Sequence, residues 1–408
     1  MTKEQRPKGA LAFGDSSVLA LGSLVSGLAA YAFIAVGARS VGSEAFAAVT
    51  VLWTLWAMSA AVFTFPVQHW VIRTIEADGG EVGVRAALRT LGFATITVSV
   101  LLGLVSWLFR FNLFGDGGLA FPIMAAIVPI GTVFMGLNRG VLSARRQFRS
   151  TALAIAGENL IRATAALAVK TAIGLGWALI GGFAIGLFWP SSYRLEKSGT
   201  SKFERSPLVF VGGVAGGSLV GQIVLTSGPL VLAIIGGLPG QITGLFSALA
   251  LFRAPYMIAI GVTPRMTAWL TRTVLDNGQV AVRGLTHKAI FAALILLPIA
   301  GVLGATIGPD VLKLVFGPGV ILSAYTTALV AAGSAVAIFT LLVTLLMLAA
   351  ARSGSISVAW ALGAAGGTAV VLSGIGSPVN TVAAAFLTAE IIALAALSVA
   401  ALRRPSPA

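Results

Sequence analysis

The sequence lacks several residues on which enzyme chemistry commonly depends. It contains no cysteine, so disulfides, thiolate nucleophiles and cysteine metal sites are excluded. Its histidines are His69 and His287, and no Gly-Lys dipeptide occurs, so the chain has no phosphate-binding loop of the ATP-hydrolysing kind. We therefore expect no covalent catalysis, no resident cofactor and no ATP-driven motor within this chain.

Charge is also scarce: charged residues make up 10% of the 408 residues, whereas a soluble domain carries about a quarter. Hydrophobic residues make up 57%, and the mean hydropathy is +0.98. A chain this apolar cannot cover a surface that faces water, so the lipid bilayer must be its solvent. Without water in the hydrocarbon, the backbone must satisfy its own hydrogen bonds as helices or as a closed barrel.

Twelve long apolar runs predict an all-α integral membrane protein, because runs of about 20 residues without alternation favour helices over barrel strands. The first run is longer than the apolar core of a signal peptide, so we expect it to remain as a helix. The predicted runs lie at 12–36, 45–66, 90–109, 122–142, 151–169, 172–190, 208–235, 242–262, 289–308, 321–349, 356–376 and 379–401.

Short motifs repeat between the first six runs and the last six. The segment from Trp70 to Gly79 resembles the segment from Trp269 to Gly278, at a spacing of 199 residues. Phe114-Gly-Asp-Gly resembles Phe316-Gly-Pro-Gly, at a spacing of 202 residues. Both spacings are about half the chain, which indicates an internal duplication.

The duplication predicts an N-terminal six-helix lobe at 1–190, a polar cytoplasmic linker at 191–206 and a C-terminal six-helix lobe at 207–408. Six helices per lobe is an even number, so the repeats are expected to be parallel. Transporters built in this way bind substrate between the lobes, near the middle of the membrane. The mixed basic and apolar segments at 67–88 and 265–287 predict short amphipathic helices at the inner surface.

The net charge of +14 fits a membrane topology better than a nucleic-acid partner. With the N-terminus inside, twenty Lys and Arg residues lie in cytoplasmic segments and four in outer loops. The four are Arg39, Arg110, Lys170 and Lys313. This bias predicts a multi-pass protein of the cell membrane with both termini cytoplasmic, in contact with anionic lipids.

Ionisable residues within the runs are candidate functional groups, because a charge inside the bilayer costs several kcal/mol. Arg253 lies in the middle of its run without an acidic neighbour along the helix, so we expect it to face water or an anionic ligand. Arg139 lies near the inner end of its run and either snorkels to the cytoplasm or contributes to the same site. The candidates are Asp15, Arg139, Glu158, Arg162, Arg253 and Glu390.

The remaining candidates allow two interpretations each. Glu158 and Arg162 are four residues apart and share a helix face, so they form either a self-neutralising pair or an oriented arginine in a watery cavity. Asp15 and Glu390 either bind a coupling ion, H⁺ or Na⁺, or serve as interfacial and pairing residues. Two further arginines, Arg73 and Arg272, mark the predicted cytoplasmic mouth.

Several motifs resemble the multidrug/oligosaccharidyl-lipid/polysaccharide exporter superfamily, and its polysaccharide-export or O-antigen flippase branch above all. ARSVGSEAF at 38–46 is similar to that family's Ala-Arg-x-Leu-Gly-Pro-Glu-x-Phe turn, although Ser43 replaces the usual proline. LPGQITGLF at 238–246 is its counterpart in the second half. GLNRGVL at 136–142 and ENLIR at 158–162 also resemble family patterns.

The resemblance implies a transporter that opens alternately to the two sides and flips an undecaprenyl-pyrophosphate-linked glycan outward. It also implies a monomer that works beside glycosyltransferases or a glycan polymerase. The alternatives are a cation-coupled multidrug exporter of the same fold and a membrane scaffold that does not transport. A multidrug exporter would need an acidic cavity, whereas the deep residues here are at least as basic as acidic.

Overall fold

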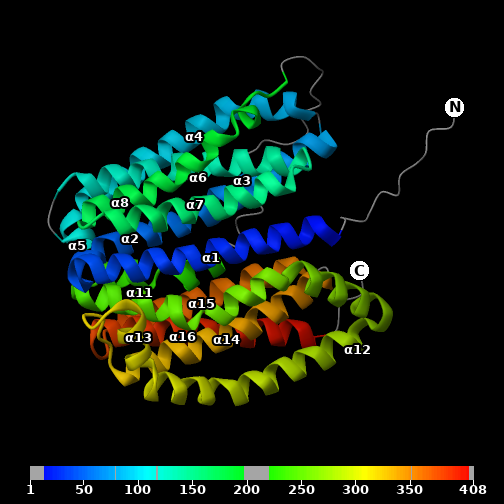
Figure 1. The fold of residues 1–408 in the computed structure, drawn as a ribbon. Helices are drawn as coiled ribbons and strands as arrows, with labels where there is room; N and C mark the ends of the chain where they lie inside the picture. The colour runs from blue at the N-terminus through cyan, green and yellow to red at the C-terminus, as the bar shows by residue number, and fades with distance from the viewer. Residues whose placement is uncertain (1–12, 79, 116–117, 197–219, 351, 404–408) are drawn as a thin grey trace.

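A computed structural model of the chain describes residues 13–403 except 79, 116–117, 197–219 and 351. All regular elements among these residues are helices, which confirms the predicted all-α membrane architecture. Helix α1 (Phe13–Val41) begins, and helix α16 (Pro378–Leu402) ends, at the same end of the bundle (Figure 1). We call this the terminal end. Helices α5 (Arg110–Phe114) and α13 (Gly308–Phe316) lie at the opposite end, the far end.

The first half of the chain continues from α1 into a long helical rod interrupted by two π-helical segments. Its remaining elements are α2 (Ser43–Ser59), η1 (Ala60–Thr64), α3 (Phe65–Arg73), η2 (Thr74–Asp78), α4 (Gly80–Leu108), α6 (Ala120–Ala144), α7 (Phe148–Ala168), α8 (Ala172–Gly181), η3 (Gly182–Phe188) and η4 (Pro190–Tyr193).

The second half repeats this plan with a longer central helix. It contains a helical stretch at 220–226, then α10 (Gly228–Ile234), α11 (Pro239–Phe252), α12 (Ala254–Thr306), α14 (Ala324–Ala349) and α15 (Ser353–Ser373), with α13 and α16 as above.

Eight helices of the described chain are long and apolar enough to cross a membrane, and two shorter apolar helices accompany them. The predicted run at 151–169 is α7, in which Glu158 and Arg162 lower the hydropathy. The predicted run at 208–235 lies partly outside the described residues. The eight helices are Ser17–Val41, Ser43–Glu76, Gly80–Leu108, Ala120–Ala144, Trp269–Thr306, Ala324–Ala349, Gly354–Ser373 and Pro378–Leu402, and the shorter ones are Ala172–Phe188 and Pro239–Phe252.

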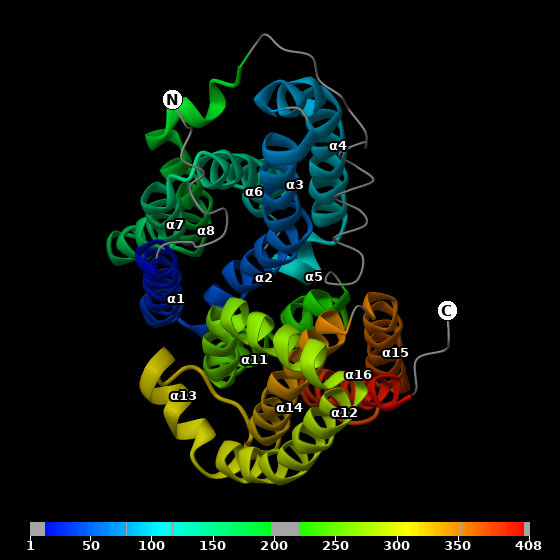
Figure 2. The ribbon, with the colours of Figure 1, turned by 90° about the vertical axis from the view of Figure 1, so that its right-hand side faces the viewer.

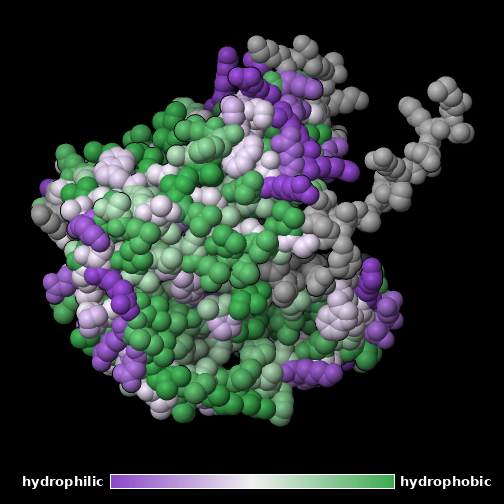
Figure 3. Space-filling view, in the orientation of Figure 1, coloured by the Kyte–Doolittle hydropathy of each residue, from purple (hydrophilic) through white to green (hydrophobic). Residues whose placement is uncertain are grey.

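The surface matches a lipid environment. Figure 3 shows hydrophobic residues over the middle of the visible face, with hydrophilic residues gathered toward the ends. Large apolar side chains such as Phe93 on α4 and Leu294 on α12 are more than half exposed. A water-soluble protein rarely exposes so continuous an apolar surface, so these helix faces contact lipid.

The helices of the two halves form separate groups in Figure 2. Helix α1 packs along α7 and also touches α11, α12 and α13, while α2 packs against α10 and α11. Helix α5 also touches α10, so the two halves meet through α1, α2 and α5 on one side and α10 to α13 on the other. The lobe boundaries at 190 and 207 stay a prediction, because most of the linker at 191–206 lies outside the described residues.

The repeated motifs fall at equivalent turns. At the terminal end, Gly80, directly after the first motif, begins α4 with a φ of 66°, and Gly278, the last residue of the second motif, breaks α12 with a φ of 55° and a ψ of −139°. At the far end, α5 ends at the buried Phe114 and α13 at the buried Phe316, and each is followed by a glycine of positive φ. The duplication is thus visible in the backbone as well as in the letters.

The segments predicted as separate amphipathic helices are instead extensions of membrane helices. Residues 67–78 continue the rod from α2, and residues 265–287 lie within α12 on both sides of the turn at Gly278. Backbone hydrogen bonds that continue along an existing helix need no new nucleation, which favours extension over a separate helix.

Because Gly278 has a backbone conformation that other residues rarely adopt, Gly278→Ala is expected to lower the free energy of unfolding by about 1–3 kcal/mol. An added Cβ would meet no atom within 4 Å, so the loss would come from the backbone alone. Gly284→Ala, in the helical part of α12 and equally uncrowded, is the control and should stabilise by about 0.4–1 kcal/mol. Thermal unfolding in detergent measures both, and equal effects would contradict the strained turn.

Candidate functional site

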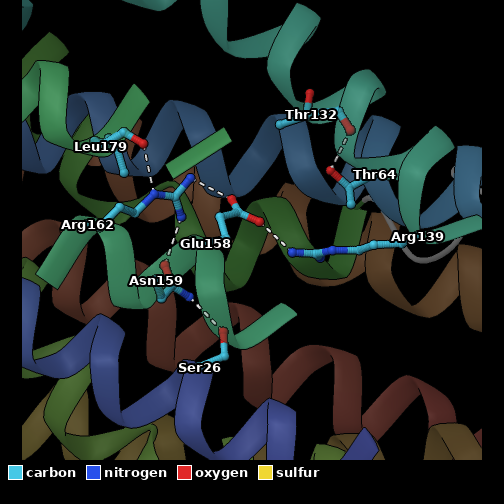
Figure 4. Close-up of polar contacts among 8 residues, drawn as sticks. All are labelled: Ser26, Thr64, Thr132, Arg139, Glu158, Asn159, Arg162 and Leu179. Carbon is cyan, nitrogen blue, oxygen red and sulfur yellow. Dashed lines mark hydrogen bonds and ion pairs between the residues drawn. The ribbon is translucent and has the colours of Figure 1, made fainter. Parts of the chain in front are cut away.

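Three of the predicted residues form one buried cluster between α6 and α7. Glu158 accepts from Arg162 Nη2 at 2.6 Å through Oε1 and from Arg139 Nη2 at 2.5 Å through Oε2. Figure 4 shows the carboxylate between the two guanidinium groups. Arg139 is 9% exposed, so it pairs within the protein instead of extending to water. The cluster carries two positive charges and one negative charge.

Arg162 is satisfied at every nitrogen. Its Nε donates to the Leu179 carbonyl at 2.8 Å, and its Nη1 donates to Asn159 Oδ1 at 2.8 Å. Asn159 in turn donates to Ser26 Oγ on α1 at 2.8 Å. The helix that follows α8 approaches so closely that a Cβ at Gly182 would lie 2.5 Å from Arg162 Nε. The guanidinium thus fastens α7 to α8 and, through Asn159, to α1.

Aromatic rings complete the surroundings of Arg162. Its Cζ lies 4.3 Å from the ring centroid of Trp56, with Phe183 and Trp53 within 6 Å. Trp53 also contacts Phe246 of α11 edge-on at 6.3 Å, across the boundary between the halves. Arg162 is 0% exposed, so the geometry favours the pairing interpretation over a position on a cavity wall.

Arg253 occupies a break between α11 and α12, where Pro255 cannot continue the hydrogen-bond ladder. Its Nε and Nη2 are buried and have no hydrogen-bond partner among the described residues. Its Cζ lies 4.7 Å from the Phe386 ring centroid. A small cavity with a volume of about 10 Å³, room for about one water molecule, is lined by Val224, Gly228, Leu245, Leu249, Arg253, Val382 and Phe386.

Glu390 is a second buried ionisable group. It is 0% exposed, and neither of its carboxylate oxygens has a hydrogen-bond partner within 3.5 Å in the described part of the chain. The Thr340 hydroxyl lies near Glu390 but donates to the Val336 carbonyl at 3.1 Å. Glu390 lies one turn after Phe386 on α16, on the same helix face. It is near enough to Arg253 for their charges to interact, yet the two form no ion pair within 4.0 Å. Beside the cavity, the structure thus holds one cationic and one acidic group that make no ion pair with each other.

Hydrogen bonds between the halves gather along the second part of α1 and the turn after it. The Tyr31 hydroxyl donates to the Ala250 carbonyl, three residues before Arg253. Arg39 donates to the Leu314 and Val315 carbonyls at the end of α13, with Nε at 3.0 Å from the latter. Thr243 Oγ1 donates to the Ser43 carbonyl at 2.6 Å. These contacts close the far end between the halves. The charge bias placed Arg39 in an outer loop, but its partners are backbone carbonyls, which no sequence motif identifies.

The other predicted residues lie away from this site. Arg73 and Arg272 are exposed, each in the helix that leads to a glycine turn at the terminal end. Asp15 belongs to α1, but its side chain lies outside the described part of the structure.

No family model matches the sequence, and no curated protein matches it. Solved structures do match. Lipid II flippase MurJ in an inward closed conformation superimposes with a TM-score of 0.70 and 15% identity, covering 95% of this chain and 88% of that one. An inward-facing multidrug resistance MATE family transporter of the MOP superfamily gives a TM-score of 0.64 and 13% identity, covering 94% and 97%. The chain has the fold of this superfamily. The expected resemblance is thereby confirmed at the level of fold.

An outward-facing multidrug resistance MATE family transporter gives a TM-score of 0.57 at 13% identity, covering 95% of this chain and 94% of that one.

Glu158→Gln should destabilise the protein by about 3–5 kcal/mol, because it leaves two buried guanidinium groups without a counter-charge. Glu76→Gln, at an exposed position of the same half, is the control and should change stability by less than about 0.5 kcal/mol. Thermal unfolding of the purified protein compares them. A stable Glu158→Gln protein would show that the cluster is not the brace described above.

Proposed function

We propose that this chain is a flippase that opens alternately to the two sides of the cell membrane. Its cargo would be an undecaprenyl-pyrophosphate-linked oligosaccharide or polysaccharide precursor, moved from the cytoplasmic to the outer leaflet. The observation that carries the proposal is Arg253, a partly buried guanidinium with two unpaired nitrogens beside a cavity. The fold supports it, because one structure with this fold is a lipid II flippase.

The chemistry of the head group suits an arginine. A guanidinium presents N–H groups in a planar fork that matches phosphate oxygens, and it keeps its charge when it is desolvated. Arg253 offers such donors, and the net positive cluster around Arg139 adds a second attractive region, with its Nε buried and unpaired among the described residues. The lipid tail would remain in the bilayer against the apolar outer surface, so only the head group needs a polar path.

The cavity beside Arg253 is too small to hold a glycan. Its volume of about 10 Å³ is far below the several hundred Å³ of a site for a drug-sized ligand. Substrate binding would therefore require the halves to separate, from the end opposite the contacts of Arg39 and Tyr31. With the terminal end cytoplasmic, the far-end contacts would block release outward until they break.

Glu390 is the proposed coupling residue. A buried carboxylate without a hydrogen-bond partner is costly as an anion, so binding H⁺ or Na⁺ would relieve it. Its neighbour Arg253 would then respond to the same ion, which links the ion to the anionic cargo. Asp15 remains a second candidate for this role. We propose a monomer, supplied by glycosyltransferases or followed by a glycan polymerase.

The unpaired Glu390 also favours one alternative, a cation-coupled multidrug exporter, since MATE transporters share the fold. An organic cation would have to bind beside Arg253, and the repulsion between like charges disfavours that arrangement. The anionic cargo is therefore the better match to the described groups.

Replacing Arg253 tests the proposed function. Arg253→Met is expected to block export while the protein stays folded, because it removes the guanidinium whose Nε and Nη2 have no partner among the described residues and leaves an apolar side chain of similar length. The measurements are accumulation of the lipid-linked intermediate in cells and thermal unfolding of the purified protein.

Arg272→Met, at an exposed position, is the matched control and should change neither quantity. Normal export by the Arg253→Met protein at normal abundance would rule out the proposed role.

Arg39→Ala should open the far end more often, because it removes the guanidinium that binds the end of α13. The chain has no cysteine, so Ser43→Cys provides a unique label. The Ser43 side chain faces Gly240 and Gly319 of the second half, while its carbonyl keeps the bond from Thr243. A membrane-impermeant maleimide applied to intact cells should react several-fold faster when Arg39 is absent.

Arg110→Ala is the control for this experiment, because Arg110 lies at the same end but stacks on Trp107 and Phe111 of its own half. An unchanged labelling rate in the Arg39→Ala protein would show that these contacts do not hold the far end closed.

A further inference from the structure

Arg145 joins three segments of the first half at the terminal end. It follows α6, and its Nε and Nη2 donate to the two carboxylate oxygens of Glu81 at the start of α4, at 2.7 and 2.9 Å. Its Nη1 donates to the Ser191 carbonyl at 2.8 Å, and Nη2 also reaches the Arg194 carbonyl at 3.3 Å. Glu81 accepts a further bond from the Glu196 N–H at 3.1 Å.

Arg352 makes the corresponding contacts in the second half. It follows α14, and its Nη2 donates to Gln279 Oε1 at 2.9 Å, just after the turn in α12. Its Nη1 donates to carbonyls at the end of α16, at 3.1 Å from Ala400 and 3.3 Å from Arg403. Gln279 Nε2 donates to the Ala401 carbonyl at 2.8 Å.

Each acceptor directly follows a glycine of positive φ, although the letter motif sets Gln279 one residue earlier than Glu81, and the arginines differ in position as well. Glu81 follows Gly80, and Gln279 follows Gly278, the two glycines of positive φ. Helices α6 and α14 both end with a bond to a carbonyl five residues back, from Gln147 and from Arg352. In that frame Arg352 matches Gln147, so Arg145 lies two residues earlier in its turn. A comparison of letters therefore does not reveal the shared arrangement.

We propose that the two halves carry the same device, an arginine clamp at the terminal end. In the first half Arg145 joins the end of α6 to the start of α4 and to the segment at 191–196. In the second half Arg352 joins the end of α14 to α12 and to the end of α16. In each clamp one guanidinium binds the residue after the glycine turn and also the backbone of the segment that ends that half in the described structure, and these two partners also bind each other. The terminal end of each half thereby moves as a unit. In the first half the clamp also fixes the beginning of the segment that leads to the second half.

The polarity of each clamp matches its own partners. Within the described residues, the partners of Glu81 are N–H donors, from Arg145 and from the Glu196 backbone, and a carboxylate accepts all of them. Gln279 faces one donor from Arg352 and the carbonyls of Ala401 and Arg403, which only an amide can satisfy together. Glu81→Gln would turn an NH₂ group toward donors, and Gln279→Glu would turn an oxygen toward carbonyls. Both exchanges are expected to weaken their clamps.

Hydrogen–deuterium exchange of the purified full chain in detergent tests the clamps without reference to transport. In Arg145→Ala we expect amides at 191–196 to exchange about tenfold faster, and in Arg352→Ala those at 399–403, each change confined to its own half. Arg145→Lys should behave like Arg145→Ala, because an ammonium cannot bridge the same acceptors. Arg149→Ala and Arg272→Ala, at exposed positions nearby, are the matched controls.

Unchanged exchange in both arginine variants would overturn the proposal. If amides at 399–403 exchange equally fast in Gln279→Glu and in the unaltered protein, the polarity argument is wrong, and the second clamp does not need the amide donor of Gln279. Because the readout is local protection, a clamp can fail while the proposed flippase stands, and the reverse also holds.

Discussion

Charge inside a bilayer must be matched by the protein itself, because the hydrocarbon offers no water to solvate it. The first half meets this constraint with Glu158 between Arg139 and Arg162, a cluster that draws α6, α7 and α8 together and reaches α1 through Asn159. Arg253 and Glu390 do not meet it. Their lack of hydrogen-bond partners among the described residues is costly, and a bound anion and cation would supply such partners. We therefore propose that the transport site lies beside Arg253 and Glu390.

The two halves share a backbone plan but divide the polar roles between them. Their glycine turns and the buried phenylalanines at the far end correspond closely. Their intramembrane charges do not correspond, since the first half pairs both Arg139 and Arg162 with Glu158, whereas the second keeps Arg253 apart from Glu390. A symmetric scaffold with an asymmetric interior suits a cargo that is itself asymmetric, with a charged head at one end and a lipid tail at the other.

Movement between the halves would be constrained differently at the two ends. At the far end, Arg39 and Thr243 connect the halves directly, so opening there requires hydrogen bonds to break. At the terminal end, Arg145 and Arg352 each act within their own half. This distribution favours two rigid bodies that separate at the terminal end first, with α1 as the element that touches both.

The sequence by itself determined the helical membrane class and the duplication, because these follow from hydropathy and from short repeated motifs. It also identified Arg139, Glu158, Arg162, Arg253 and Glu390 as costly residues. Only the tertiary structure decided that Arg162 is a brace and Arg253 is unpaired. The deciding partners are the Leu179 carbonyl, the Arg139 guanidinium and the face of α16, and all lie on other helices. Which helix faces meet depends on how each helix is rotated about its axis and on the angle at which helices cross. In lipid, apolar residues occur on every side of a helix, so hydropathy determines neither the rotation nor the crossing angle.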